Sequence, residues 1–102
     1  MKLVYAAFVI TGVLSAGTAA ATEKLALSSG CMTCHTMDRK AIGPGYKEIA
    51  AKYRNEKGAE AKMIQKVKSG GSGVWGPAPM PPNPHVKDDD IKAIVQWILS
   101  LK

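Results

Sequence analysis

Two cysteines and a histidine stand close together in the first half of the chain and could carry out chemistry as one unit. They form the segment Cys31-Met32-Thr33-Cys34-His35, a C-x-x-C-H pattern, which is typical of covalent haem attachment. Each thiol adds to one haem vinyl group, and two intervening residues span the distance between the vinyls. The imidazole that follows is placed to bind the iron. The pattern therefore predicts one haem c, bound through thioethers to Cys31 and Cys34, with His35 as the proximal iron ligand.

Three other uses of the two cysteines compete with haem attachment. A redox dithiol of the thioredoxin type also uses C-x-x-C, but it requires a βαβ context that the sequence lacks, and it leaves His35 without a role. A zinc site needs four ligands, and adjacent Cys34 and His35 would chelate poorly even with His85 as the fourth. A structural disulfide across so short a loop would constrain little of the unfolded chain. We favour haem and keep a dithiol oxidoreductase as the alternative.

An iron bound by one histidine needs a sixth ligand, or a reason to lack one. The side chains that could supply it are His85, Met32, Met37, Met63 and Met80. Met32 and Met37 lie too near the ligand histidine in sequence to reach the opposite face of a haem. Met63 fits the core face of a helix, and His85 fits a surface position just before another helix.

Met80 lies in a loop of unusual composition. Residues 69–84 contain four glycines and five prolines, which excludes a helix or a central strand. Val74, Trp75 and Met80 are expected to anchor this loop by burial. Prolines on both sides fix the Met80 backbone, and a thioether is a soft ligand that raises the potential of a haem iron. Met80 is therefore favoured as the sixth ligand, rather than as a core methionine that fills a gap.

Apolar side chains recur at helical spacing in the segments that must position this site. We expect short helices at residues 23–29, 46–53 and 59–68, and a longer one near the end of the chain. The inward face of the second helix consists of Tyr46, Ile49, Ala50 and Tyr53. The last helix has Asp88 as its expected N-cap, with two further aspartates in its first turn. The predicted fold class is all-α, with four short helices around one haem.

The first residues of the chain read as an export signal. Met1 and Lys2 form a positive start, residues 3–14 are apolar and uncharged, and Ala19 and Ala21 form an A-x-A arrangement. The apolar stretch is shorter than the roughly 20 residues that span a bilayer. We expect cleavage after residue 20 or 21, which leaves residues 22–102 as a single exported domain without stable membrane insertion.

Composition and charge narrow the choice of partners. The chain of 102 residues is 46% hydrophobic and 22% charged, with a formal net charge of +6, as in ordinary globular proteins. Losing the signal removes one lysine and no acid, so the charge falls to +5. A basic chain suits nucleic acid, an anionic membrane or an acidic protein. Nucleic acid is disfavoured because the chain is exported and its lysines are spread over three helices.

The exported part is small and poor in aromatic residues. Its aromatic side chains are Tyr46, Tyr53, Trp75 and Trp97. A chain of this size is marginally stable by burial alone, and such chains often depend on a metal or a bound group. The haem is therefore expected to fill the centre of the fold.

Four segments together resemble the small bacterial class I cytochromes c of the cytochrome c-551 type. They are the C-x-x-C-H motif and residues 42–53, 73–83 and 95–102, and the similarity covers essentially all of residues 22–102. The resemblance implies a compact all-α fold around one haem. It also implies that Met80 is the distal iron ligand.

The resemblance assigns further roles residue by residue. Pro44 matches a proline whose carbonyl accepts a hydrogen bond from the ligand histidine. Trp75 matches a tryptophan whose indole N–H reaches a haem propionate, and Asn83 matches an asparagine near the methionine sulfur. Gly30 and Trp97 match positions where the terminal helices cross. Lys66 stands where some relatives have an arginine near a propionate.

The resemblance also implies a function. Such proteins are periplasmic, monomeric one-electron carriers rather than enzymes. They connect a quinol-oxidising complex or another cytochrome to an oxidase or a terminal reductase, such as nitrite reductase. The partners are redox proteins, expected here to have an acidic docking surface. A ligand-binding haem sensor with a weak or absent Met80 bond is a further alternative, which carbon monoxide binding to the ferrous protein would distinguish.

Overall fold

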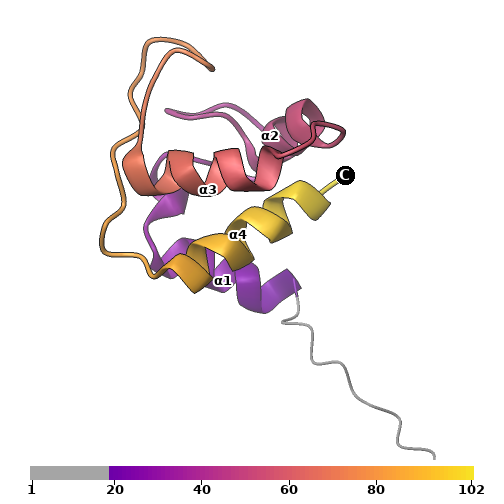
Figure 1. Ribbon diagram of the computed structural model, residues 1–102, viewed down its shortest axis with the longest axis vertical. Coiled ribbons are helices and arrows are strands. Elements are labelled where there is room, and N and C mark those ends of the chain that lie inside the picture. Colours follow the sequence, from indigo (N-terminus) through magenta and orange to yellow (C-terminus); the bar gives the residue numbers. More distant parts are fainter. Residues whose placement is uncertain (1–18) are drawn as a thin grey trace, which may run out of the picture.

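The computed structural model describes residues 19–102, which are helical apart from their loops (Figure 1). The elements are α1 (Ala19–Ser28), the 3-10 turn η1 (Cys31–Thr33), α2 (Tyr46–Tyr53), α3 (Ala59–Ser69) and α4 (Asp88–Ser100). Over residues 19–102 the only β-type pairing is an isolated antiparallel bridge between Gly71 and Met80. The predicted all-α class and the number of helices are confirmed.

Most of the predicted signal peptide, residues 1–18, lies outside the described residues. The first helix begins at Ala19, earlier than the predicted start at residue 23, because the alanines before that point continue its helical backbone. It ends at Ser28, and the turn that follows contains Gly30, whose φ of 89° lies in the left-handed region that glycine tolerates best. Among residues 19–102, no helix is both long and apolar enough to cross a membrane.

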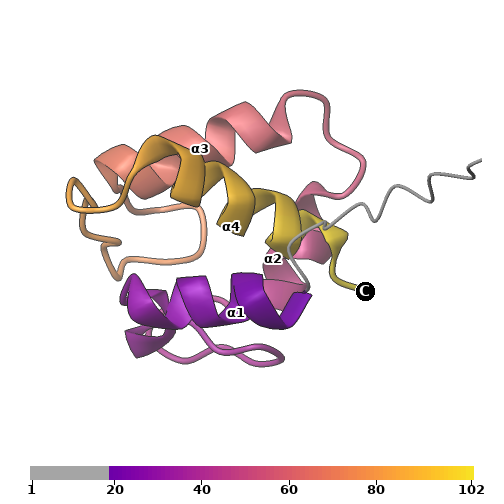
Figure 2. The same cartoon turned by 90° about the horizontal axis from the view of Figure 1, so that it is seen from below.

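Helix α4 is the centre of the packing. It contacts α1, α2 and α3, and Figure 2 shows it lying between α3 on one side and α1 on the other. Its buried face consists of Ile91, Ile94, Val95, Trp97 and Ile98. Ala26 of α1, Tyr46 and Ile49 of α2, and Met63 of α3 complete the core. The inward faces predicted for α2 and α4, and the core position predicted for Met63, are therefore confirmed.

The N-cap prediction for the last helix is wrong by one residue. Lys87 occupies the N-cap position with an extended backbone, and no side chain caps the helix there. Asp88 is instead the first residue of the helix. Its Oδ1 forms an ion pair with Lys68 Nζ at 3.1 Å. The three aspartates still place negative charge beside the positive end of the helix dipole. This part of the prediction does not depend on which residue is the N-cap.

The glycine- and proline-rich loop is irregular, as predicted, but one of its expected anchors is not buried. Trp75 and Met80 are half-buried, whereas Val74 is 51% exposed. Val74 stands next to Gly73, whose φ is 97°, in the part of the loop that extends away from α3. Sequence hydrophobicity alone could not show that this turn carries the valine outward.

Candidate haem site

The two cysteines lie in a tight turn that follows directly from α1. After the left-handed Gly30, the backbone N–H groups of Cys34 and His35 both donate to the Cys31 carbonyl, at 3.3 and 3.0 Å. Both thiols are unpaired and half-buried. Burial raises the pKa of the Cys31 thiol, although a backbone hydrogen bond partly opposes this. The turn thus holds the two thiols and the imidazole on one rigid segment.

One hydrogen bond determines the tautomer of His35. Its Nδ1 lies 2.7 Å from the carbonyl oxygen of Pro44. Because a carbonyl oxygen only accepts hydrogen bonds, Nδ1 must carry the proton in the neutral ring. The other nitrogen, Nε2, then has a free lone pair and is available to bind a metal. This contact is the one that the resemblance implied for Pro44.

The ring of His35 is held between a bare backbone and another aromatic ring. A Cβ at Gly43 would lie 2.7 Å from His35 Cε1 and 3.0 Å from Nδ1, so any larger residue there would displace the imidazole. On α2, the Tyr46 ring stacks against the His35 ring, with centroids 5.6 Å apart. Gly43 was missed as a site residue, although its place directly before Pro44 was a usable signal.

Tyr46 links this site to the core. Its ring meets Trp97 edge-on at 5.4 Å, and its side chain is among the most buried of residues 19–102. The hydroxyl is buried without a hydrogen-bond partner in this part of the chain. Burial raises the pKa of Tyr46 well above its usual range, and nearby Cys31 and Glu23 raise it further. Tyr46 therefore stays neutral and acts by packing.

The possible sixth ligands are placed very differently. Met63 is buried within the helical core. His85 is exposed, and its Nε2 contacts the Ser29 carbonyl at 3.3 Å. Met32 and Met37 pack against the core from the segment around the C-x-x-C-H motif. Met80 is half-buried in the loop that follows α3 and stands outside the core cluster.

Two more residues implied by the resemblance tie this loop to the helices. The Asn83 amide donates to the Val67 carbonyl at 3.0 Å and to the Pro81 carbonyl at 3.2 Å, so both of its N–H groups face backbone. The indole of Trp75 lies 5.6 Å from the Lys52 ammonium, within the range of cation–π attraction. Lys66 folds toward the start of the loop, where a Cβ at Gly71 would lie 2.5 Å from its Nζ.

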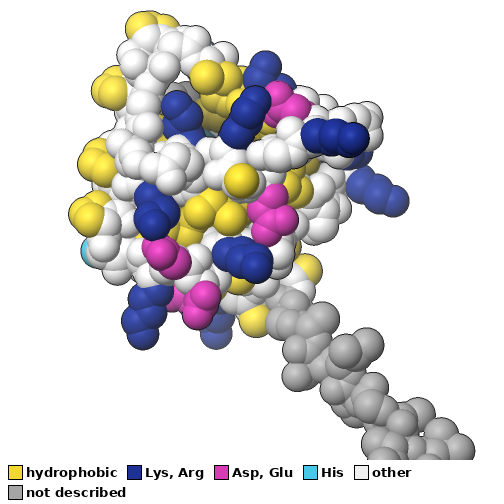
Figure 3. All heavy atoms as spheres, viewed as in Figure 1, with side chains coloured by type: hydrophobic (Ala, Val, Ile, Leu, Met, Phe, Trp, Pro, Cys, Tyr) yellow, Lys and Arg dark blue, Asp and Glu magenta, His cyan; other side chains and the backbone are white. Residues whose placement is uncertain are grey.

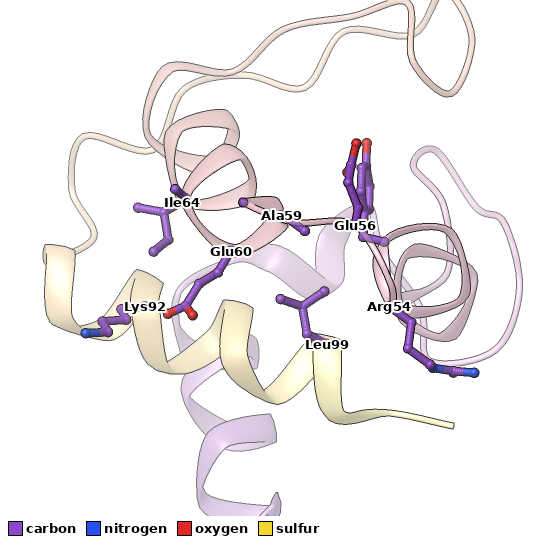
Figure 4. Close-up of a pocket in the computed structure, with 10 residues that line it drawn as sticks. Arg54, Glu56, Ala59, Glu60, Ile64, Lys92 and Leu99 are labelled. Atoms are coloured by element: carbon purple, nitrogen blue, oxygen red, sulfur yellow. The ribbon is translucent and has the colours of Figure 1, made fainter.

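An open groove lies elsewhere on the molecule, among the end of α2, the start of α3 and the side of α4 (Figure 4). It has a volume of about 560 Å³. Its walls mix charged side chains, among them Arg54, Glu60 and Lys92, with the apolar Ile64 and Leu99. None of the predicted site residues lines it, so the groove is separate from the candidate haem site.

The donor set fits a covalently bound haem. Two unpaired thiols stand on one short turn, and the adjacent imidazole has its Nδ1 against the Pro44 carbonyl, which leaves Nε2 available to a metal. Among residues 19–102, no three side chains of His, Cys, Asp or Glu come together as a metal site. An all-α fold with a C-x-x-C-H turn at the end of its first helix defines the class of small c-type cytochromes.

Comparison with known proteins gives the family. The cytochrome c family profile matches residues 19–102, and the chain belongs to this family. It is 49% identical over 80 residues to cytochrome c-551 of Pseudomonas aeruginosa, an alignment that covers 78% of this chain and 76% of that protein. It is 46% identical over 95 residues to cytochrome c-552 of Nitrosomonas europaea, covering 93% and 92% of the two chains.

The fold agrees with a solved relative. The crystal structure of wild-type Nitrosomonas europaea cytochrome c552 superimposes with a TM-score of 0.76 at 48% identity, covering 78% of this chain and 99% of that one. Membership of the family confirms the predicted cofactor. The chain carries haem c, for which Cys31 and Cys34 supply the two thioethers. It is an electron-transport protein rather than an enzyme, so the dithiol oxidoreductase is set aside.

Proposed function

We propose that His35 and Met80 are the two axial ligands of the haem iron. The observation that carries the proposal is the hydrogen bond from His35 Nδ1 to Pro44, which leaves Nε2 as the only donor the ring can offer to a metal. Met80 is favoured over Met63, which is buried in the helical core, and over His85, whose ring faces the Ser29 carbonyl.

Neighbouring residues of the chain hold the two proposed ligand side chains in place. Gly43 and Tyr46 fix the imidazole plane, and Pro44 selects the tautomer of the ring. Asn83 anchors the loop that carries Met80. For Trp75 we propose that the indole N–H holds a propionate, with the Lys52 ammonium against its ring. If both side chains bound the iron, no position would stay open for an added ligand, which would favour electron transfer over ligand binding.

The function is one-electron transfer between protein partners in the periplasm. When bound, haem c supplies an iron that alternates between the ferric and ferrous states. The donor is a quinol-oxidising complex or another cytochrome, and the acceptor is a terminal reductase, such as nitrite reductase, or an oxidase. A potentiometric titration followed by assays with candidate reductases and oxidases tests this. Carbon monoxide binding to the ferrous protein at neutral pH would instead favour a haem sensor.

The mature protein is expected to carry one covalent haem. Protein matured in a bacterial periplasm should show the mass of residues 22–102, or of 21–102, plus a single haem. Thioether bonds survive denaturation, so a haem stain of the denatured protein should also be positive. A mass equal to the bare chain with two free thiols would contradict the assignment, and a retained signal segment would contradict the predicted cleavage.

Positive charge is expected to steer the protein to an acidic partner. Arg39 and Lys40 flank the loop beside His35 and make no ion pair within residues 19–102, as is also true of Lys66 and Lys87. Lys47 is paired with Asp38 at 2.9 Å. On the face seen in Figure 3, basic and acidic side chains are interspersed, whereas residues 22–102 as a whole carry a formal charge of +5.

The rate of reaction with the acceptor should therefore depend on salt. The screening length falls from about 30 Å at 0.01 M to about 3 Å at 1 M, and the second-order rate should drop about tenfold or more. Lys40→Gln should lower the low-salt rate, whereas Lys57→Gln, in the turn between α2 and α3, should not. A rate that is flat or rises with salt would mean that docking depends on apolar contact, and that the lysines serve solubility.

A further inference from the structure

The loop that carries Met80 is closed at its base by backbone hydrogen bonds. Gly71 N–H donates to the Met80 carbonyl at 3.0 Å, and Met80 N–H donates to the Gly71 carbonyl at 2.7 Å. Further on, Asn83 N–H donates to the Val67 carbonyl at 3.2 Å. Figure 1 shows the loop leaving the end of α3 and returning beside it. Met80 is thus attached through its own backbone to Gly71, just after the end of α3, and Asn83 attaches the same loop to Val67 of α3.

This closure depends on a close approach that only glycine permits. A Cβ at Gly70 would collide with the Met80 carbonyl oxygen and would lie 2.9 Å from both Pro81 C and Pro82 N. These are backbone atoms, and the two prolines restrict how far they can move. A Cβ at Gly71 would instead meet the flexible end of Lys66. The absence of a side chain at Gly70 is therefore what lets the backbone of residues 80–82 approach the end of α3.

We infer that Gly70 and the Gly71–Met80 bridge form a clamp that positions Met80 independently of its bond to the iron. The inference rests on the proposed role of Met80 as a ligand. A backbone held in place before binding loses little entropy when the sulfur binds, so the clamp keeps the thioether near the iron and limits its replacement by other ligands. Gly70 is a positioning residue, since it acts only through Met80.

Gly58→Ala is the control variant for Gly70→Ala on the same helix. Gly70 has φ +71° at the C-terminal end of α3, and Gly58 has φ +76° at the N-terminal end, but a Cβ at Gly58 would meet nothing within 4 Å. The two variants differ in backbone cost: Gly58, with ψ 8°, lies in the left-handed helical region, whereas Gly70, with ψ −168°, lies in a region that is essentially restricted to glycine. Gly58→Ala therefore controls for a Cβ at a positive-φ end of the same helix, and the ligand readouts below and hydrogen exchange carry the test of the clamp. Only the Gly70 variant pushes on the Met80 carbonyl.

The readouts are those of the ligand bond. Gly70→Ala should weaken the sulfur-to-iron charge-transfer band of the ferric holoprotein and lower its reduction potential. It should also increase the apparent affinity of the ferric protein for added imidazole about tenfold, the size expected for ordinary overpacking strain. Gly58→Ala should match the wild type in all three. Equal behaviour of the two variants would overturn the clamp.

A second measurement does not depend on whether Gly70→Ala folds or takes up haem. Amide hydrogen exchange of the ferrous holoprotein should show slow exchange for the N–H groups of Gly71 and residue 80, in the wild type and in Met80→Ala. Both N–H groups keep their backbone partners in that variant. If removing the sulfur brings their exchange to the rate of the exposed Val74 N–H, the bridge depends on the iron bond and the inference is wrong.

The two proposals fail in different ways. If the wild type lacks the charge-transfer band, or if Met80→Ala leaves it unchanged, Met80 is not the ligand, whatever Gly70→Ala does. If Met80→Ala removes the band while Gly70→Ala behaves as Gly58→Ala does, the ligand assignment stands and the clamp is wrong.

Discussion

Met80→Ala is expected to abolish the sulfur-to-iron charge-transfer band of the oxidised protein and to lower the reduction potential on the order of 100 mV, within the range over which axial ligands tune haem iron. The thioether is a soft donor that favours ferrous iron, and alanine offers no replacement. The loop itself should persist, because its bridge uses only backbone atoms of residue 80. Visible absorption and a potentiometric titration measure the two effects.

The matched control for this prediction is Met63→Leu. Met63 is 8% exposed, and it packs in the core, where leucine conserves the volume and usually costs less than about 1.5 kcal/mol. The band and the potential should stay as in the wild type. If Met63→Leu removes the band, or if His85→Ala does so, another residue is the ligand and the argument from the proline-rich loop fails.

A chain without haem is expected to lose most of its helical structure. The cluster around α4 is small, and Cys31, Met32 and Trp75 pack against it only in part. A core of this size rarely supplies more than about 3–5 kcal/mol, and without haem these residues would border an unfilled space. A Cys31→Ala, Cys34→Ala double variant should therefore show a much weaker helical circular dichroism signal than the holoprotein.

Wild-type chain produced without haem attachment is the control, because it keeps both thiols. If it loses helix to the same extent as the double variant, the missing haem is the cause rather than the missing cysteines. A cooperative thermal transition of the double variant close to that of the holoprotein would contradict the prediction. The helical core would then be sufficient by itself.

Local patterns in the sequence were enough for most of the fold. The spacing of Tyr46, Ile49 and Ala50 identifies the buried face of α2, and the apolar residues of α4 identify its core face. Such faces follow from helix periodicity alone, because a helix must bury its apolar stripe. The C-x-x-C-H motif is equally local, since the two thiols and the imidazole are arranged by one turn of backbone.

The exact ends of helices and the exposure of single side chains were harder to predict from the sequence. The N-cap of α4 is Lys87 rather than Asp88, because Asp88 is already helical and pairs with Lys68 of α3, which lies 20 residues earlier. Val74 is exposed rather than buried, because positive-φ glycines direct the loop outward. The first depends on how two helices meet and the second on the path of a loop, and residue type reveals neither.

The sequence by itself therefore determined the cofactor chemistry and the four helices, and it predicted which residues bind iron. Only the tertiary structure decided which backbones approach closely enough to need glycine: Gly43 against the His35 ring, and Gly70 against the Met80 carbonyl. It also decided which lysines are neutralised, as Lys47 is by Asp38. Helix periodicity and the motif follow from regular local backbone, whereas these steric contacts and this ion pair depend on how the loops fold back on themselves, which residue type alone does not specify.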